Sequence, residues 1–127
     1  MSDSLIRLLI IDDEDDLLHV LKETAPTQGF HVSLATSTDE ALRLLASGVE
    51  VDVVLCDLSM PDGGAEHWLR RCAGAHPTLA SRTIVITGWT HTDNGGVVGE
   101  LGADRCLFKP FAMSEVRRMA ERLLHSS

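Results

Sequence analysis

Five short apolar runs, separated by amphipathic segments, dominate the pattern of hydrophobic and polar positions along the chain. Two of them, at 5–11 and 51–57, are nearly continuous, interrupted by Arg7 and Asp52, and each leads abruptly into carboxylates. Continuous runs of this length are typical of strands covered on both faces, as in a parallel sheet. The other three are shorter and fall at 30–35, 82–87 and 105–108. We therefore predict five strands.

Segments with apolar residues at spacings of three and four follow these runs, which predicts amphipathic helices. Four such segments lie at 17–25, 37–48, 65–74 and 114–124. A fifth, at 89–101, is expected to be helical from its place in the order, but it contains three glycines. Three glycines lower helix propensity by roughly 3 kcal/mol relative to alanine, so we expect a short or frayed helix there, the most mobile part of the domain.

Local chemistry predicts where the helices begin and end. Ser37, three residues before Glu40, has the spacing of a capping box. Pro26 either ends the first helix near Ala25 or kinks its last turn. Ser114 is the expected cap of the last helix.

Five strands that alternate with five helical segments predict an α/β fold. The economical architecture is a (βα)5 doubly wound, five-stranded parallel sheet of order 2-1-3-4-5, flavodoxin-like, with helices on both faces. The 127 residues suit one domain, 1–127, which should bury roughly two-thirds of its unfolded surface. A second domain does not fit in this length.

Composition limits the kinds of partner and the cellular compartment that we expect. The formal charge is −8, from 11 basic and 19 acidic residues, which argues against nucleic acid or an anionic membrane as a partner. Cys56, Cys72 and Cys106 are an odd count without Cys-x-x-Cys spacing, and we expect them to be buried, reduced thiols. With no signal sequence and no apolar run near the ~18 residues of a membrane span, a soluble cytoplasmic protein is expected.

Four of the five predicted strands end in polar residues: Asp12 and Asp13, Asp57, Thr87, and Lys109. In the order 2-1-3-4-5 the first and third strands are neighbours, so the three aspartates should meet at the edge where such sheets bind ligands. Carboxylates about 6 Å apart repel by roughly 3 kcal/mol per pair at an effective dielectric of ~20, so the cluster requires cations. Lys109 supplies one charge and a divalent ion two. Carboxylates and a loop carbonyl such as that of Ser59 favour Mg²⁺ over zinc.

A hard cation beside a partly desolvated carboxylate, with a lysine and a hydroxyl opposite, is suited to phosphoryl transfer. Asp57 is the expected nucleophile, and Lys109 and the metal would neutralise the phosphoryl oxygens. Thr87 is placed to move and hydrogen-bond the phosphoryl group. Its movement would leave space beneath the adjoining helix, which predicts a conformational switch.

These motifs occur in a fixed order along the chain: Asp12-Asp13, Asp57 followed by Met60-Pro61, Thr87 followed by Gly88, and Lys109-Pro110-Phe111. With them the chain resembles, over essentially its whole length, the receiver domain of two-component response regulators. It is similar in size and spacing to the single-domain chemotaxis type, and the receiver of a hybrid histidine kinase or larger regulator also fits.

The resemblance implies a function in two-component signal transduction. Asp57 would accept a phosphoryl group from a phosphohistidine on a sensor histidine kinase or a histidine phosphotransfer protein. The resemblance also implies ligands of Mg²⁺, held directly or through water: Asp12, Asp13, Asp57 and the Ser59 carbonyl. Lys109 would bind the phosphoryl group, and Thr87 would sense it.

Two features depart from the usual receiver pattern. Receivers usually carry an aromatic residue three positions before the lysine, where this chain has Cys106, which cannot report by ring rotation. The loop after Met60-Pro61 is about one residue shorter than common, with Asp62-Gly63-Gly64. Trp89, two residues after Thr87, would either shield the acyl phosphate from water or pack against the weak fourth helix.

Two other functions fit the sequence less well. A pseudo-receiver that docks partners without phosphorylation would have no need of the intact aspartate, threonine and lysine set. A phosphohydrolase with an aspartyl nucleophile typically has a second acid two residues after that nucleophile, where this chain has Ser59. We therefore expect no enzyme activity beyond the domain's own phosphorylation and dephosphorylation.

Overall fold

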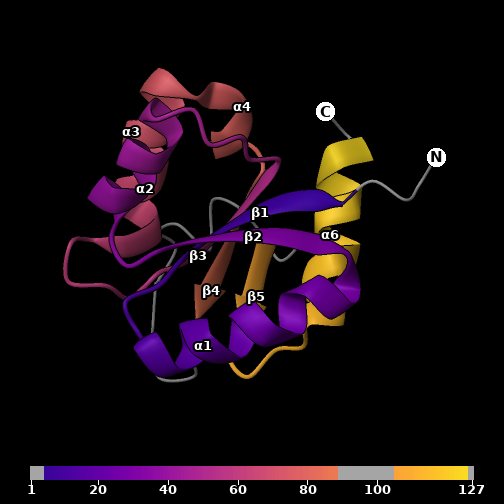
Figure 1. Cartoon of the computed structure of the whole chain (residues 1–127). Helices are drawn as coiled ribbons and strands as arrows, with labels where there is room; N and C mark the ends of the chain where they lie inside the picture. Colours follow the sequence, from indigo (N-terminus) through magenta and orange to yellow (C-terminus); the bar gives the residue numbers. More distant parts are fainter. Residues whose placement is uncertain (1–4, 89–104, 126–127) are drawn as a thin grey trace.

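A computed structural model of the chain describes residues 5–88 and 105–125 (Figure 1). The predicted helix at 89–101, with Trp89, lies outside these residues. The elements are β1 (Ile6–Ile11), α1 (Asp15–Thr24), the 3₁₀ helix η1 (Ala25–Gln28), β2 (Phe30–Ala35), α2 (Thr38–Ala46), β3 (Val53–Asp57), α3 (Gly64–Ala75), α4 (Pro77–Ala80), β4 (Thr83–Thr87), β5 (Cys106–Phe108) and α6 (Met113–His125).

The five strands form one parallel sheet in the order β2-β1-β3-β4-β5, which confirms the predicted topology. The register pairs Ile11 at the end of β1 with Cys56 in β3, and Asp57 with Ile86 in β4. The strand tips therefore lie beside one another at one edge of the sheet. The residues that directly follow β1 therefore lie at the same edge as the last residue of β3.

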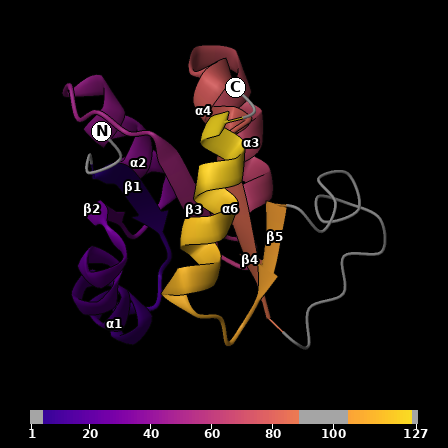
Figure 2. The same ribbon diagram turned by 90° about the vertical axis from the view of Figure 1, so that its right-hand side faces the viewer.

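Helices cover both faces of the sheet, with α1 and α6 on one face and α2 and α3 on the other (Figures 1 and 2). Successive strand residues alternate between the two faces. The first face packs Leu8, Ile10, Leu55, Ile84 and Ile86 against α1 and α6. The second packs Leu9, Val54, Cys56 and Val85 against α2 and α3. Each fully buried aliphatic side chain contributes roughly 1.5–3 kcal/mol, so these two layers hold the strands in place.

Trp68 anchors α3 to the sheet. Its side chain is fully buried, and its Nε1 donates a hydrogen bond to Thr83 Oγ1 at 3.1 Å. The Thr83 hydroxyl donates in turn to the Leu79 carbonyl at 2.9 Å, so these buried polar groups have partners. This contact fixes the helix whose first residues follow the loop after Asp57.

One predicted helix cap is confirmed and one is wrong. The Ser37 hydroxyl accepts a hydrogen bond from the Glu40 amide at 3.0 Å, as the capping-box spacing predicts. Ser114 does not cap the last helix, because α6 already begins at Met113. The cap comes from Glu115, whose carboxylate accepts a hydrogen bond from the Ala112 amide at 2.8 Å.

Prolines open two short helices. Helix α1 ends at Thr24, and Pro26 lies in the first turn of η1. Pro77 begins α4, the short helix that follows α3. Proline suits the first turn because the amide that it lacks has no helical partner there.

The three cysteines are free and buried, as predicted. Among the residues that the structure describes, no helix has the length and apolar character needed to cross a bilayer.

Candidate functional site

Three carboxylates meet at the carboxyl-terminal edge of the sheet. Asp12 and Asp13 directly follow β1, and Asp57 is the last residue of β3. One carboxylate oxygen from each lies within 4.8 Å of the others. Asp12 and Asp57 are buried, and Asp13 is exposed. The structure thus brings together the three aspartates that the sequence singled out.

Asp12 is held by the turn that leads into α1. Its backbone amide donates to the Ala35 carbonyl of β2 at 3.1 Å, and its Oδ1 accepts from the Glu14 amide at 2.9 Å. Within residues 5–88 and 105–125, its buried Oδ2 has no hydrogen-bond partner. Because a buried carboxylate oxygen without a hydrogen bond is costly, this atom marks a place suited to a cation, and the Lys109 ammonium lies 3.7 Å from it.

Asp57 is positioned by the loop that follows it. The Leu58 amide donates to the Ile86 carbonyl at 2.8 Å, which continues the β3–β4 ladder beyond the strand. The Ser59 amide donates to Asp57 Oδ1 at 3.2 Å. The backbone amide of Ser59 therefore contacts the Asp57 carboxylate. The role of the Ser59 carbonyl as a metal ligand stays a prediction.

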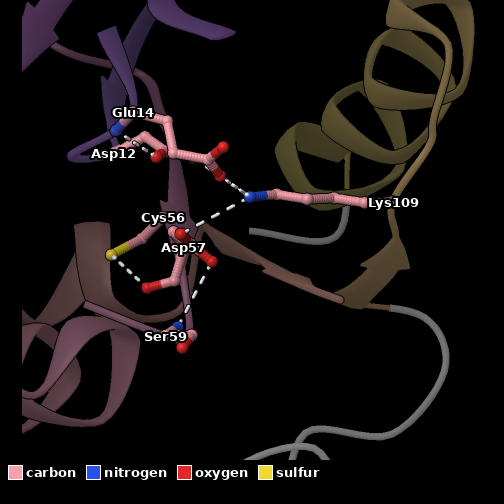
Figure 3. A network of polar contacts seen from close by, with 6 residues as sticks. All are labelled: Asp12, Glu14, Cys56, Asp57, Ser59 and Lys109. Carbon is pink, nitrogen blue, oxygen red and sulfur yellow. Dashed lines mark hydrogen bonds and ion pairs between the residues drawn. The ribbon is translucent and has the colours of Figure 1, made fainter. Parts of the chain in front are cut away.

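Lys109 reaches the cluster from the end of β5 (Figure 3). Its backbone amide donates to the Thr87 carbonyl at 2.9 Å, and the peptide bond to Pro110 is cis. Its Nζ lies 3.6 Å from Asp57 Oδ2 and 3.7 Å from Asp12 Oδ2. The lysine is thus directed at the aspartates, as the sequence predicted.

Thr87 ends β4, the strand next to Asp57 in the sheet. Thr87 is 1% exposed, and its Oγ1 makes no hydrogen bond to any other described residue. A buried hydroxyl without a partner is costly in a resting structure, so it is available to a group that arrives at the strand tip.

Sequence reasoning missed Glu14. It lies in a run of acidic residues that is typical of a solvated helix start, yet Glu14 Oε1 lies 2.6 Å from Lys109 Nζ. Its place directly after the acidic pair was the only available signal.

The electrostatics of the site follow from burial. Burial raises the pKa of Asp12 to about 6. The hydrogen bond from the Glu14 amide and the charge of Lys109 lower this pKa, but by less than burial raises it. Burial also raises the pKa of Asp57, against the Ser59 amide and Lys109. Burial would lower the pKa of Lys109, but its carboxylate neighbours raise it overall. The resting site therefore holds more negative charge than its surroundings stabilise.

In the absence of divalent cations, we expect the protein to become more stable when the pH falls from 7 to 5. The pKa of Asp12 is about 6 in the folded protein against its ordinary value of 3.8, so between these values the folded protein binds more protons than the unfolded chain. Stability then falls as pH rises through this window, and Asp12 alone should contribute about 1 kcal/mol between pH 5 and 7. Urea unfolding in a chelator at both pH values measures this. Greater stability at pH 7 would contradict it.

Comparison with known proteins places this geometry in a family. A profile of the response regulator receiver domain matches residues 8–121. The chain is 30% identical over 118 residues to the regulatory protein AtoC of Escherichia coli, covering 93% of this chain and 25% of AtoC. It is 31% identical over 122 residues to the transcriptional regulatory protein CpxR of Klebsiella pneumoniae, covering 95% and 50%. The chain thus spans half or less of these curated relatives.

Solved structures give the same result. A response regulator receiver domain from Clostridium thermocellum superposes with a TM-score of 0.82 at 28% identity, covering 96% of each chain. A response regulator from Chloroflexus aurantiacus, described as putative, superposes with a TM-score of 0.78 at 25% identity, covering 96% of this chain and 99% of that one.

Proposed function

Because the chain belongs to the response regulator receiver domain family, we propose that Asp57 accepts a phosphoryl group from a histidine kinase or a histidine phosphotransfer protein. The observation that carries this proposal is the placement of Asp57: a buried carboxylate at a strand tip, 3.6 Å from Lys109 Nζ and clustered with Asp12 and Asp13. A carboxylate with a raised pKa and a cation opposite is equipped to act as a nucleophile on phosphorus.

We propose Mg²⁺ as the cofactor. The donors are all oxygens, which suits this ion, and the buried Asp12 Oδ2 without a hydrogen bond fits a position next to a cation. Asp12, Asp13, Asp57 and the Ser59 carbonyl would hold the ion directly or through water. When bound, it neutralises carboxylate and phosphoryl charge, as in other phosphoryl transfer sites.

Three residues of the chain would have separate roles in the transfer of the phosphoryl group. An Asp57 oxygen forms a bond to phosphorus while the bond from phosphorus to the donor nitrogen breaks, and the electron pair leaves with the imidazole, which then takes a proton. The product carries about one more negative charge than the free carboxylate. Lys109, whose Nζ lies 3.6 Å from Asp57 Oδ2, would bind a phosphoryl oxygen. The Thr87 hydroxyl, which has no hydrogen-bond partner within the described part of the chain, would donate to another phosphoryl oxygen, and its movement would be the start of the switch.

The proposal extends to the rest of the chain. The family match leaves only seven residues before it and six after it, so we assign 1–127 to one receiver domain. Buried free thiols suit a reducing compartment, which supports a cytoplasmic location. Activity on an external phosphomonoester is not expected, since Ser59 stands where a phosphohydrolase would need an acid.

Labelling by a small phosphodonor tests the proposal. Incubation with acetyl phosphate and Mg²⁺ should add one phosphoryl group, measured by intact-protein mass spectrometry, and a chelator should prevent it. Asp57→Asn should abolish the addition. Asp39→Asn, an exposed aspartate in α2 far from the cluster in sequence, serves as the matched control and should be labelled like the wild type. Labelling that survives Asp57→Asn, or its absence in the wild type, would overturn the proposal.

A further inference from the structure

The site contains one carboxylate that the proposed chemistry does not use. Glu14 Oε1 is 2.6 Å from Lys109 Nζ, whereas the nearest oxygens of Asp57 and Asp12 are 3.6 and 3.7 Å away (Figure 3). Glu14 is not part of the carboxylate cluster formed by the three aspartates. The lysine expected to bind the phosphoryl group is therefore closest to a residue that is not the acceptor.

The backbone places Glu14 independently of its side chain. Its amide donates to Asp12 Oδ1 at 2.9 Å, and its carbonyl accepts from the Leu18 amide at 3.0 Å, at the start of α1. The side chain is 59% exposed, and its one ion pair among the described residues crosses the site to a lysine 95 residues later. A change confined to this carboxylate should therefore leave the turn and the helix intact.

We infer that Glu14 is a positioning residue, which competes with Asp57 for the Lys109 ammonium in the resting protein and thereby slows acceptance of a phosphoryl group. This inference rests on the proposed function. The Lys109 ammonium must leave Glu14, at least in part, before it can serve a phosphoryl oxygen on Asp57. An ion pair with one largely exposed partner is modest in strength, so its release should change the rate by about three- to fivefold.

Two matched neutral substitutions test the inference. Glu14→Gln keeps the size of the side chain but removes its charge, and should accelerate phosphorylation of Asp57 about three- to fivefold. Asp15→Asn removes the same charge from the next residue, which is exposed and begins α1, and should leave the rate unchanged. Equal acceleration in both variants, or none in Glu14→Gln, would overturn the inference.

The choice of phosphodonor separates release of the lysine from simple charge repulsion. At pH 7, phosphoramidate is mainly a monoanion and acetyl phosphate a dianion. If Glu14 acts through Lys109, Glu14→Gln should accelerate both reactions by the same factor, mainly in the rate at high donor concentration. A clearly larger factor for acetyl phosphate, expressed as tighter donor binding, would show that Glu14 only repels the donor and would overturn the inference.

Lysine side-chain NMR supplies a readout that needs no phosphorylation. The sequence contains two lysines, Lys22 and Lys109, so a Lys22→Arg protein identifies the Lys109 ammonium signal. This signal should shift in Glu14→Gln and stay in place in Asp15→Asn. An unmoved signal in Glu14→Gln would overturn the inference.

A wild-type protein that is never phosphorylated would instead overturn the proposed function. A labelled wild type with an unchanged Glu14→Gln rate would overturn only the role of Glu14.

Discussion

Replacement of Gly64 by alanine is expected to lower the free energy of unfolding by about 3 kcal/mol. Gly64 begins α3 with φ +57°, a conformation that side chains disfavour. An added Cβ would lie 2.4 Å from the Leu58 carbonyl oxygen and 2.7 Å from that of Asp57. Both atoms belong to the backbone and cannot rotate away, so the loop after the acceptor would have to shift. We therefore also expect weaker Mg²⁺ binding in this variant.

The same replacement at Gly74, near the other end of α3, is the control. Gly74 is exposed, and an added Cβ would meet no atom within 4 Å. Alanine there should raise stability by up to about 1 kcal/mol through helix propensity and leave Mg²⁺ binding unchanged. Urea unfolding followed by circular dichroism, with calorimetric Mg²⁺ titration, measures both effects. A Gly64→Ala protein as stable as the wild type would show that the loop adapts without cost.

The sequence predicted the sheet and its polar edge because both depend on patterns within short segments. The apolar runs that end in Asp12 and Asp57 determine the strands, and the alternation of strands with helices leaves few topologies to consider. The partner of Glu14 could not be predicted in this way. Its neighbours form an ordinary acidic helix start, and nothing local indicates that a lysine 95 residues later lies within hydrogen-bond distance.

The short loop after Asp57 shows a similar limit. In sequence, Asp62-Gly63-Gly64 indicates only a tight turn. In the structure, Asp62 Oδ2 accepts from the Thr38 amide at 2.8 Å and from its hydroxyl at 2.9 Å, and Oδ1 accepts from the Gly64 amide at 3.0 Å. One carboxylate thus caps the starts of both α2 and α3, which favours its charge. These contacts depend on how two helices converge, which no local pattern encodes.

Replacement of Asp12 by asparagine is expected to change stability and metal binding in opposite directions. The pKa of Asp12, raised to about 6 by burial, means that its charge disfavours the folded state at pH 7. Asparagine keeps an oxygen for the Glu14 amide and removes the charge. Without divalent cations, we expect a gain of up to about 3 kcal/mol at pH 7. Loss of one of three carboxylates should weaken Mg²⁺ binding by on the order of tenfold.

Asp13→Asn distinguishes the effect of a buried charge on stability from the effect of removing a charge from the cluster. It removes the same charge from the same cluster, so Mg²⁺ binding should weaken as well. Because Asp13 is exposed, its charge remains hydrated, and stability should change by less than about 0.5 kcal/mol. Urea unfolding in a chelator and calorimetric Mg²⁺ titration of both variants measure these effects. Equal stabilisation by the two changes would mean that repulsion among the carboxylates, and not the burial of Asp12, disfavours the resting site.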